Sequence, residues 1–130
     1  WGDETEGALM LMHPDDVWNW VEQNVEQRAW FVAVSVPKVL AHREDKVCWA
    51  REILIRYGHR DDVRRNLISN FSTEGWTGPT SLHLQRKIDN LLEFSSKETN
   101  KTVLSWIDEY VAHLQEQLKQ AQIEEEREEY

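Results

Sequence analysis

The chain has 130 residues, of which 40% are hydrophobic and 30% charged, and its formal net charge is −9. This length and composition predict one folded, soluble domain and exclude an intrinsically disordered chain. The acidic balance disfavours a nucleic-acid partner, because phosphate contacts need clustered lysine and arginine. The single cysteine, Cys48, excludes an internal disulfide and is compatible with a cytoplasmic location. No segment approaches the roughly 20 apolar residues of a membrane span.

Turn-forming residues are scarce, with five glycines and three prolines, so the sequence favours a few long helices. Residues 1–12 are assigned to a lead-in segment, residues 13–124 to a helical repeat domain and residues 125–130 to an acidic tail. Short connections between about six helices predict antiparallel hairpins. The predicted pairs are 14–26 with 28–41, 43–58 with 60–72, and 79–96 with 101–124.

The first predicted helix opens at Pro14, a residue that suits a first helical turn. Val17, Trp20 and Val21 form its apolar stripe, because they are three and four residues apart. Trp18 lies two positions from Trp20, and residues two apart face different directions. Trp18 is therefore predicted to be exposed and is a candidate for contact with a partner.

The second predicted helix is nearly all apolar from Ala29 to Val36, which indicates a buried segment. Periodicity alone does not separate a buried strand from a buried helix here. A helix is predicted because the neighbouring segments are helical, and Pro37 should end or kink it. In the third predicted helix, Gly58 is placed as the C-terminal cap.

A loop that holds Trp76 between two glycines separates the fourth and fifth predicted helices. Gly75 and Gly78 permit backbone angles that other residues resist, and Pro79 suits the start of the next helix. Trp76 has two interpretations. It packs back onto Leu82 or between hairpins as an anchor of the fold, or it is an exposed interface residue, since tryptophan is enriched at binding hot spots.

The turn between the third and fourth helices is basic, and Arg60, Arg64 and Arg65 are candidate partner-binding residues. Asp61 and Asp62 lie among them and would neutralise part of their charge. The first interpretation is a solvated, ion-paired turn. The alternatives are a contact patch for an acidic partner and, least favoured, a nucleic-acid site.

Motifs that carry chemistry are missing from the sequence. There is no HExxH, P-loop, GxGxxG or GxSxG pattern, and no two histidines are four residues apart. No catalytic, cofactor-binding or metal-binding residue is predicted, and no cofactor. The chain is predicted not to be an enzyme.

The stretch WAREILIRYGHRDDVRRNLISNF resembles a HEAT-type unit, and HPDDVWNWVEQNVEQRAWFVAVSVP is similar in layout. With GWTGPTSLH and WIDEYVAHLQEQLKQAQIEEERE, the order resembles C-terminal helical regions of large bacterial multidomain proteins. Some of these carry NTPase or nuclease domains and act in phage defence. The resemblance implies an all-α, HEAT-like α-solenoid fragment of stacked antiparallel hairpins.

The resemblance also implies a function without chemistry. The chain would be a non-catalytic module for protein recognition or docking, the C-terminal part of a larger bacterial protein that in some cases acts as a defence sensor. The alternative is a free-standing acidic helical inhibitor or immunity protein, whose carboxylates would match a basic partner. No membrane partner is expected.

Overall fold

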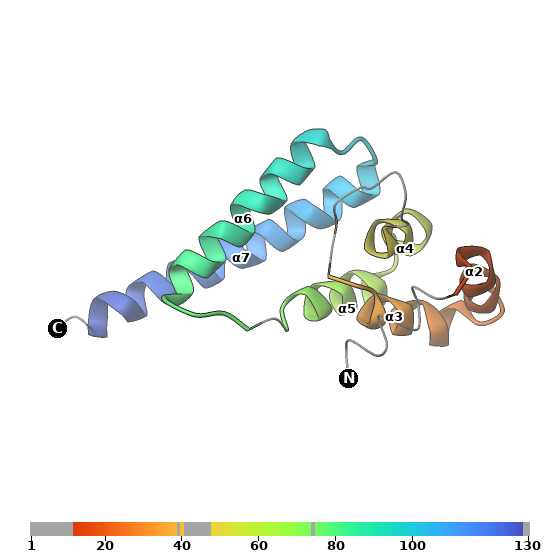
Figure 1. Ribbon diagram of the computed structural model, residues 1–130, viewed down its shortest axis with the longest axis horizontal. Helices are drawn as coiled ribbons and strands as arrows, with labels where there is room; N and C mark the ends of the chain where they lie inside the picture. Colours follow the sequence, from red (N-terminus) through yellow and green to blue (C-terminus); the bar gives the residue numbers. More distant parts are fainter. Residues whose placement is uncertain (1–11, 39, 41–47, 74, 129–130) are drawn as a thin grey trace. The chain divides into compact units, whose positions relative to one another are not determined.

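The computed structural model describes residues 12–38, 40, 48–73 and 75–128, which form six helices and no strand (Figure 1). The prediction of an all-helical chain with about six helices is confirmed over this part of the sequence. The chain divides into two compact units, Trp1–Thr73 and Glu74–Tyr130. The division falls inside the range that the sequence assigned to a single helical domain.

The first unit contains α2 (Pro14–Glu22), α3 (Val25–Ser35), α4 (Trp49–Tyr57) and α5 (Asp61–Phe71). Helix α3 contacts the other three, and its most extensive contact is with α5. The sequence pairing had placed these two helices in different hairpins. The solenoid of stacked hairpins therefore stays a prediction, whereas the helices themselves are observed.

Local capping residues set where the first two helices begin. The Nδ1 atom of His13 accepts a hydrogen bond from the backbone N–H of Asp15 at 3.2 Å, and Pro14 occupies the first turn. The Oδ1 atom of Asn24 accepts from the backbone N–H of Gln27 at 3.3 Å. Because an asparagine N-cap starts a new helix, α2 ends at Glu22, before the predicted boundary at residue 26.

The end of α3 depends on a proline and on a buried asparagine from α5. Pro37 has no N–H, so the carbonyl of Ala33 lacks the donor that a helix would normally supply four residues ahead. The side-chain amide of Asn70 donates to this carbonyl at 3.1 Å and to the carbonyl of Val36 at 2.8 Å. Helix α3 therefore ends at Ser35, earlier than the predicted residue 41, and its end is joined to α5.

The second unit is a pair of helices, α6 (Thr80–Lys97) and α7 (Lys101–Glu128), which lie side by side and antiparallel (Figure 1). The Oδ1 atom of Asn100 accepts from the backbone N–H groups of Thr102 and Val103, at 3.0 and 3.1 Å. This asparagine caps α7 and fixes the short connection between the helices.

Helix α6 begins without a capping side chain of its own, because Pro79 precedes it. The carboxylate of Glu125 fills this role from the far end of α7. It accepts from the backbone N–H of Ser81 at 3.1 Å and from the Ser81 hydroxyl at 2.7 Å. A carboxylate is favourable at a helix N-terminus, where the dipole is positive. Residues 125–128, assigned from sequence to an acidic tail, thus continue the helix.

The buried apolar side chains come from every helix, and burying each large aliphatic or phenylalanine side chain contributes roughly 1.5–3 kcal/mol relative to exposure. In the first unit the largest are Trp18, Trp49, Ile53, Leu54, Tyr57, Leu67 and Phe71. In the second unit the buried apolar side chains are Leu84, Ile88, Leu91, Val103, Trp106, Ile107, Tyr110, Val111, Leu114 and Ala121.

Candidate protein-interaction face

Helix α3 is apolar on two sides, and only one of them is buried. Ala29, Val32 and Ala33 have 1% exposure or less. The outward-facing residues of the same helix fall on one continuous arc of about 140°, given 3.6 residues per turn. They are Glu26, Gln27, Trp30, Phe31 and Val34. A helix that is apolar all round is normally covered on all sides.

Four exposed side chains from α2 and α3 form what we name the aromatic face: Trp20, Trp30, Phe31 and Val34. Their exposed fractions are 40%, 37%, 47% and 36%, respectively. The ring of Phe31 lies edge-on to both tryptophans, with centroid distances of 6.3 Å to Trp20 and 6.2 Å to Trp30. Edge-to-face contacts at this distance are favourable, so the rings support one another on the surface.

Arg28 holds one side of the aromatic face in place. Its guanidinium carbon lies 4.5 Å from the centroid of the Trp20 ring. One of its nitrogens donates to the Trp20 carbonyl at 2.7 Å and to the Oε1 atom of Gln23 at 3.2 Å. Arginine thus caps the end of α2 and stacks on the indole, which orders Trp20 before any partner arrives.

The prediction that Trp18 is exposed is wrong, because its side chain is buried with 3% exposure. Its ring centroid lies 5.6 Å from that of Trp49 and 6.4 Å from that of Tyr57, both on α4. The guanidinium of Arg56 covers the ring at 4.9 Å. Contacts with α4 therefore select Trp18 for the core, and Trp20, predicted to lie on the buried stripe, is exposed instead.

Tyr57 also links α4 to α2 through its hydroxyl, which donates a hydrogen bond to the Oε1 atom of Glu22. Burial of the phenol, together with the hydrogen bond to this carboxylate and its charge, raises the pKa of Tyr57 to about 12. The phenol is thus neutral at ordinary pH and acts as a donor. It fixes the helix that presents Trp20.

Trp76 is 47% exposed and stacks on the ring of His83, with centroids 4.3 Å apart and planes 3° from parallel. The predicted contact partner Leu82 is itself exposed. Gly78 adopts φ of +86°, a left-handed conformation that side chains resist, so the predicted need for glycine holds there. The indole therefore packs on the first turns of α6 through His83 and keeps an open face.

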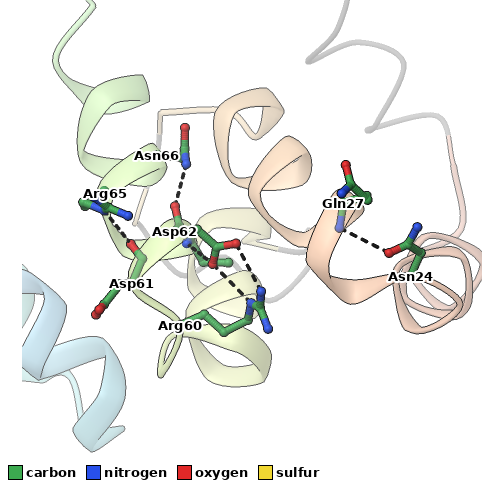
Figure 2. A network of polar contacts seen from close by, with 8 residues as sticks. Asn24, Gln27, Arg60, Asp61, Asp62, Arg65 and Asn66 are labelled. Carbon is green, nitrogen blue, oxygen red and sulfur yellow. Dashed lines mark hydrogen bonds and ion pairs between the residues drawn. The ribbon is translucent and has the colours of Figure 1, made fainter.

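The arginines of the basic turn form hydrogen bonds with residues close to them in sequence, and Figure 2 shows these bonds for Arg60 and Arg65. Arg60 binds both carboxylate oxygens of Asp62, at 3.1 and 3.2 Å. Arg64 donates to the Gly58 carbonyl at 3.1 Å, and Arg65 donates to the carbonyl of Asp61 at 3.4 Å. All three arginines predicted as partner-binding residues thus bond to nearby residues of the turn or of the first turn of α5.

The same contacts shift the pKa values of Arg60 and Asp62. Hydrogen bonding to Asp62 raises the pKa of Arg60, and the charge of Glu26 adds to the shift. Partial burial opposes ionisation of Asp62, but hydrogen bonds from Arg60 and from the Val63 N–H lower the pKa of its carboxyl below the ordinary value. Both shifts follow from an ion pair at the start of α5, where a carboxylate is favourable.

None of the helices in the described part of the chain is both long and apolar enough to cross a membrane. Among the same residues, no group of three or more histidine, cysteine, aspartate or glutamate side chains could hold a metal ion.

Comparison with known proteins gives no relationship: no family model, curated protein or solved structure matches this chain. The resemblance to HEAT-type units therefore stays a prediction from the sequence.

Sequence reasoning missed Trp20, Trp30, Phe31 and Val34 as surface residues. The sequence contained one signal of an exposed apolar surface, because the run from Ala29 to Val36 is nearly all apolar and has no polar face to turn towards solvent. That pattern led to the prediction that the whole segment is buried. The structure instead covers one side of α3 with neighbouring helices and leaves the other exposed.

Proposed function

We propose that this chain is a non-catalytic helical module that recognises another protein, and that the aromatic face is its contact surface. The observation that carries the proposal is the exposure of two tryptophans, a phenylalanine and a valine on adjacent helices. Aromatic side chains and arginine are the residues most enriched at binding hot spots. A contiguous exposed apolar patch is a common mark of a protein-interaction site.

The rigidity of this surface supports the same proposal. Trp20 is ordered by Arg28, and Phe31 lies against both tryptophans. A surface that is already ordered loses less conformational freedom on binding, and this favours affinity. The shifted pKa values of Tyr57, Arg60 and Asp62 are explained by bonds that hold the first unit together. The wider setting, a C-terminal part of a bacterial defence protein, stays a prediction from the resemblance.

The experiment compares capture of proteins from source-cell lysate by three immobilised chains, measured by quantitative mass spectrometry. They are the wild type, the double variant Trp30→Ala/Phe31→Ala, and the control Leu82→Ala/Leu92→Ala. The control removes exposed leucines of α6. We expect a partner that binds the wild type and the control. Its capture by Trp30→Ala/Phe31→Ala should be at least about tenfold lower.

Folding of each variant is checked by urea unfolding, because exposed side chains should change stability by only about 0.5–1 kcal/mol. Equal capture by the wild type and a folded face variant would contradict the proposal. So would the absence of any protein captured specifically by the wild type.

A further inference from the structure

We propose, building on the function above, that the aromatic face binds an amphipathic helix of a different protein, whose apolar ridge is flanked by lysine or arginine. The spacing of the outward residues on α3 is the first ground. Gln27, Trp30, Phe31 and Val34 stand at positions i, i+3, i+4 and i+7, and three of the four are large and apolar. This is the ridge that one helix presents to another.

Charge around the aromatic face is the second ground. Helices α2 and α3 together carry four carboxylates, on Asp15, Asp16, Glu22 and Glu26, against one arginine, which gives a formal charge of −3. Asp16 stands one turn before Trp20, and Glu26 one turn before Trp30.

Two arginines near this surface have partners within the chain. Arg28 binds the Trp20 carbonyl and Gln23, and Arg60, whose pKa reflects the charge of Glu26, binds Asp62. Glu22 accepts a hydrogen bond from the Tyr57 hydroxyl, so Asp16 and Glu26 are the carboxylates that the edge of the aromatic face presents to an arriving partner. Lysine or arginine beside the partner's apolar ridge would match them, and would speed and orient association.

The same charge argues against two other occupants. A second copy of this chain would bring together two acidic helix pairs, each of formal charge −3, and like charges across an interface are costly. An anionic lipid surface attracts basic segments, not acidic ones. A basic amphipathic helix is the occupant for which both the apolar ridge and its charged edges are favourable.

The experiment uses the intact 130-residue chain and three synthetic peptides of about five helical turns, a length that can span the ridge. The first has leucine at i, i+3, i+4 and i+7 with lysine at the flanking positions. The second replaces each lysine by glutamate. The third has the composition of the first with its leucine order scrambled. Dissociation constants are measured by titration calorimetry at low and high salt.

The lysine peptide should bind at least about tenfold more tightly than either of the other two, and high salt should weaken it. Trp30→Ala/Phe31→Ala should remove this preference, whereas Leu82→Ala/Leu92→Ala should not. Equal binding of the glutamate peptide or of the scrambled peptide would overturn the inference.

Two companion measurements address the other occupants. Concentration-dependent dimerisation that is abolished by Trp30→Ala/Phe31→Ala would overturn the inference in favour of a second copy. Binding to vesicles of phosphatidylcholine and phosphatidylglycerol would overturn it in favour of a lipid surface. If lysate capture depends on the aromatic face but the peptides do not discriminate, the proposed function stands and the basic-helix inference fails.

Discussion

Asn70 offers the most direct test of how the first unit is held together. Its side-chain amide donates to the carbonyls of Ala33 and Val36, at 3.1 and 2.8 Å, and one of these carbonyls lacks its helical donor because of Pro37. Replacing Asn70 by alanine removes both donors and leaves two carbonyls without that bond. Each buried unsatisfied group costs about 1–3 kcal/mol, so Asn70→Ala should lower the free energy of unfolding by about 2–4 kcal/mol.

Asn66 provides a matched control on the same helix. Its side-chain amide donates to the carbonyl of Asp62, one turn earlier in the same helix, α5. Asn66→Ala should change stability by about 1 kcal/mol or less, and both variants gain the same helix propensity from alanine. Asn70→Asp, which keeps the shape but loses the donors, should be at least as destabilising as Asn70→Ala.

The assay is urea unfolding followed by far-UV circular dichroism, with hydrogen exchange of the α3 amides measured by mass spectrometry. Exchange resolves the first unit even if the two units unfold separately. Faster exchange at the end of α3 in Asn70→Ala, but not in Asn66→Ala, is expected. If the two variants have unfolding free energies within about 0.5 kcal/mol of each other, the role assigned to Asn70 is refuted.

Two further predictions concern bonds between distant helices. Glu125→Ala should lower the free energy of unfolding by about 0.5–2 kcal/mol and speed amide exchange in the first turn of α6, because the start of that helix loses its cap. An equal effect from Glu126→Ala, which removes a neighbouring exposed carboxylate, would argue against a specific cap. The raised pKa of Tyr57, about 12, means that its stabilisation is complete below about pH 10, the ordinary tyrosine value, and is lost as pH rises towards 12. Urea unfolding across this range should show a steeper decline for the wild type than for Tyr57→Phe, and parallel curves would show that the phenol is not responsible.

The choice between Trp18 and Trp20 shows where sequence reasoning reaches its limit. At 100° per residue, the two indoles lie about 80° on either side of the direction set by Val17 and Val21. The pattern of α2 therefore contains no preference between them. The rings of Trp49 and Tyr57, more than 30 residues further along the chain, decide which one is buried.

Helix existence was predictable because it depends on local signals. His13, Pro14 and Asn24 act within a few residues of themselves, and Pro37 ends α3 by its own chemistry. The position of each helix among its neighbours depends on contacts between residues far apart. The amide of Asn70 reaches a carbonyl 37 residues away in the sequence, and no periodic pattern announces such a contact.

The arginines of the basic turn also show that contacts between residues close in sequence are predictable, whereas contacts between distant residues are not. Their neighbouring aspartates correctly indicated local ion pairing for Arg60, which binds Asp62. The candidate surface on α3 could not be predicted in this way. An apolar run indicates that much of a helix is apolar, but it does not indicate which neighbouring helices pack against it. Only the three-dimensional structure shows which helices pack against α3.

The distribution of indoles gives the protein a built-in optical reporter. Trp18, Trp49 and Trp106 are shielded from water, whereas Trp20, Trp30 and Trp76 are open to it. Emission from the open group should respond to iodide quenching, and the shielded group should serve as an internal reference. Docking on α3 would shift part of that emission to the blue without any attached dye.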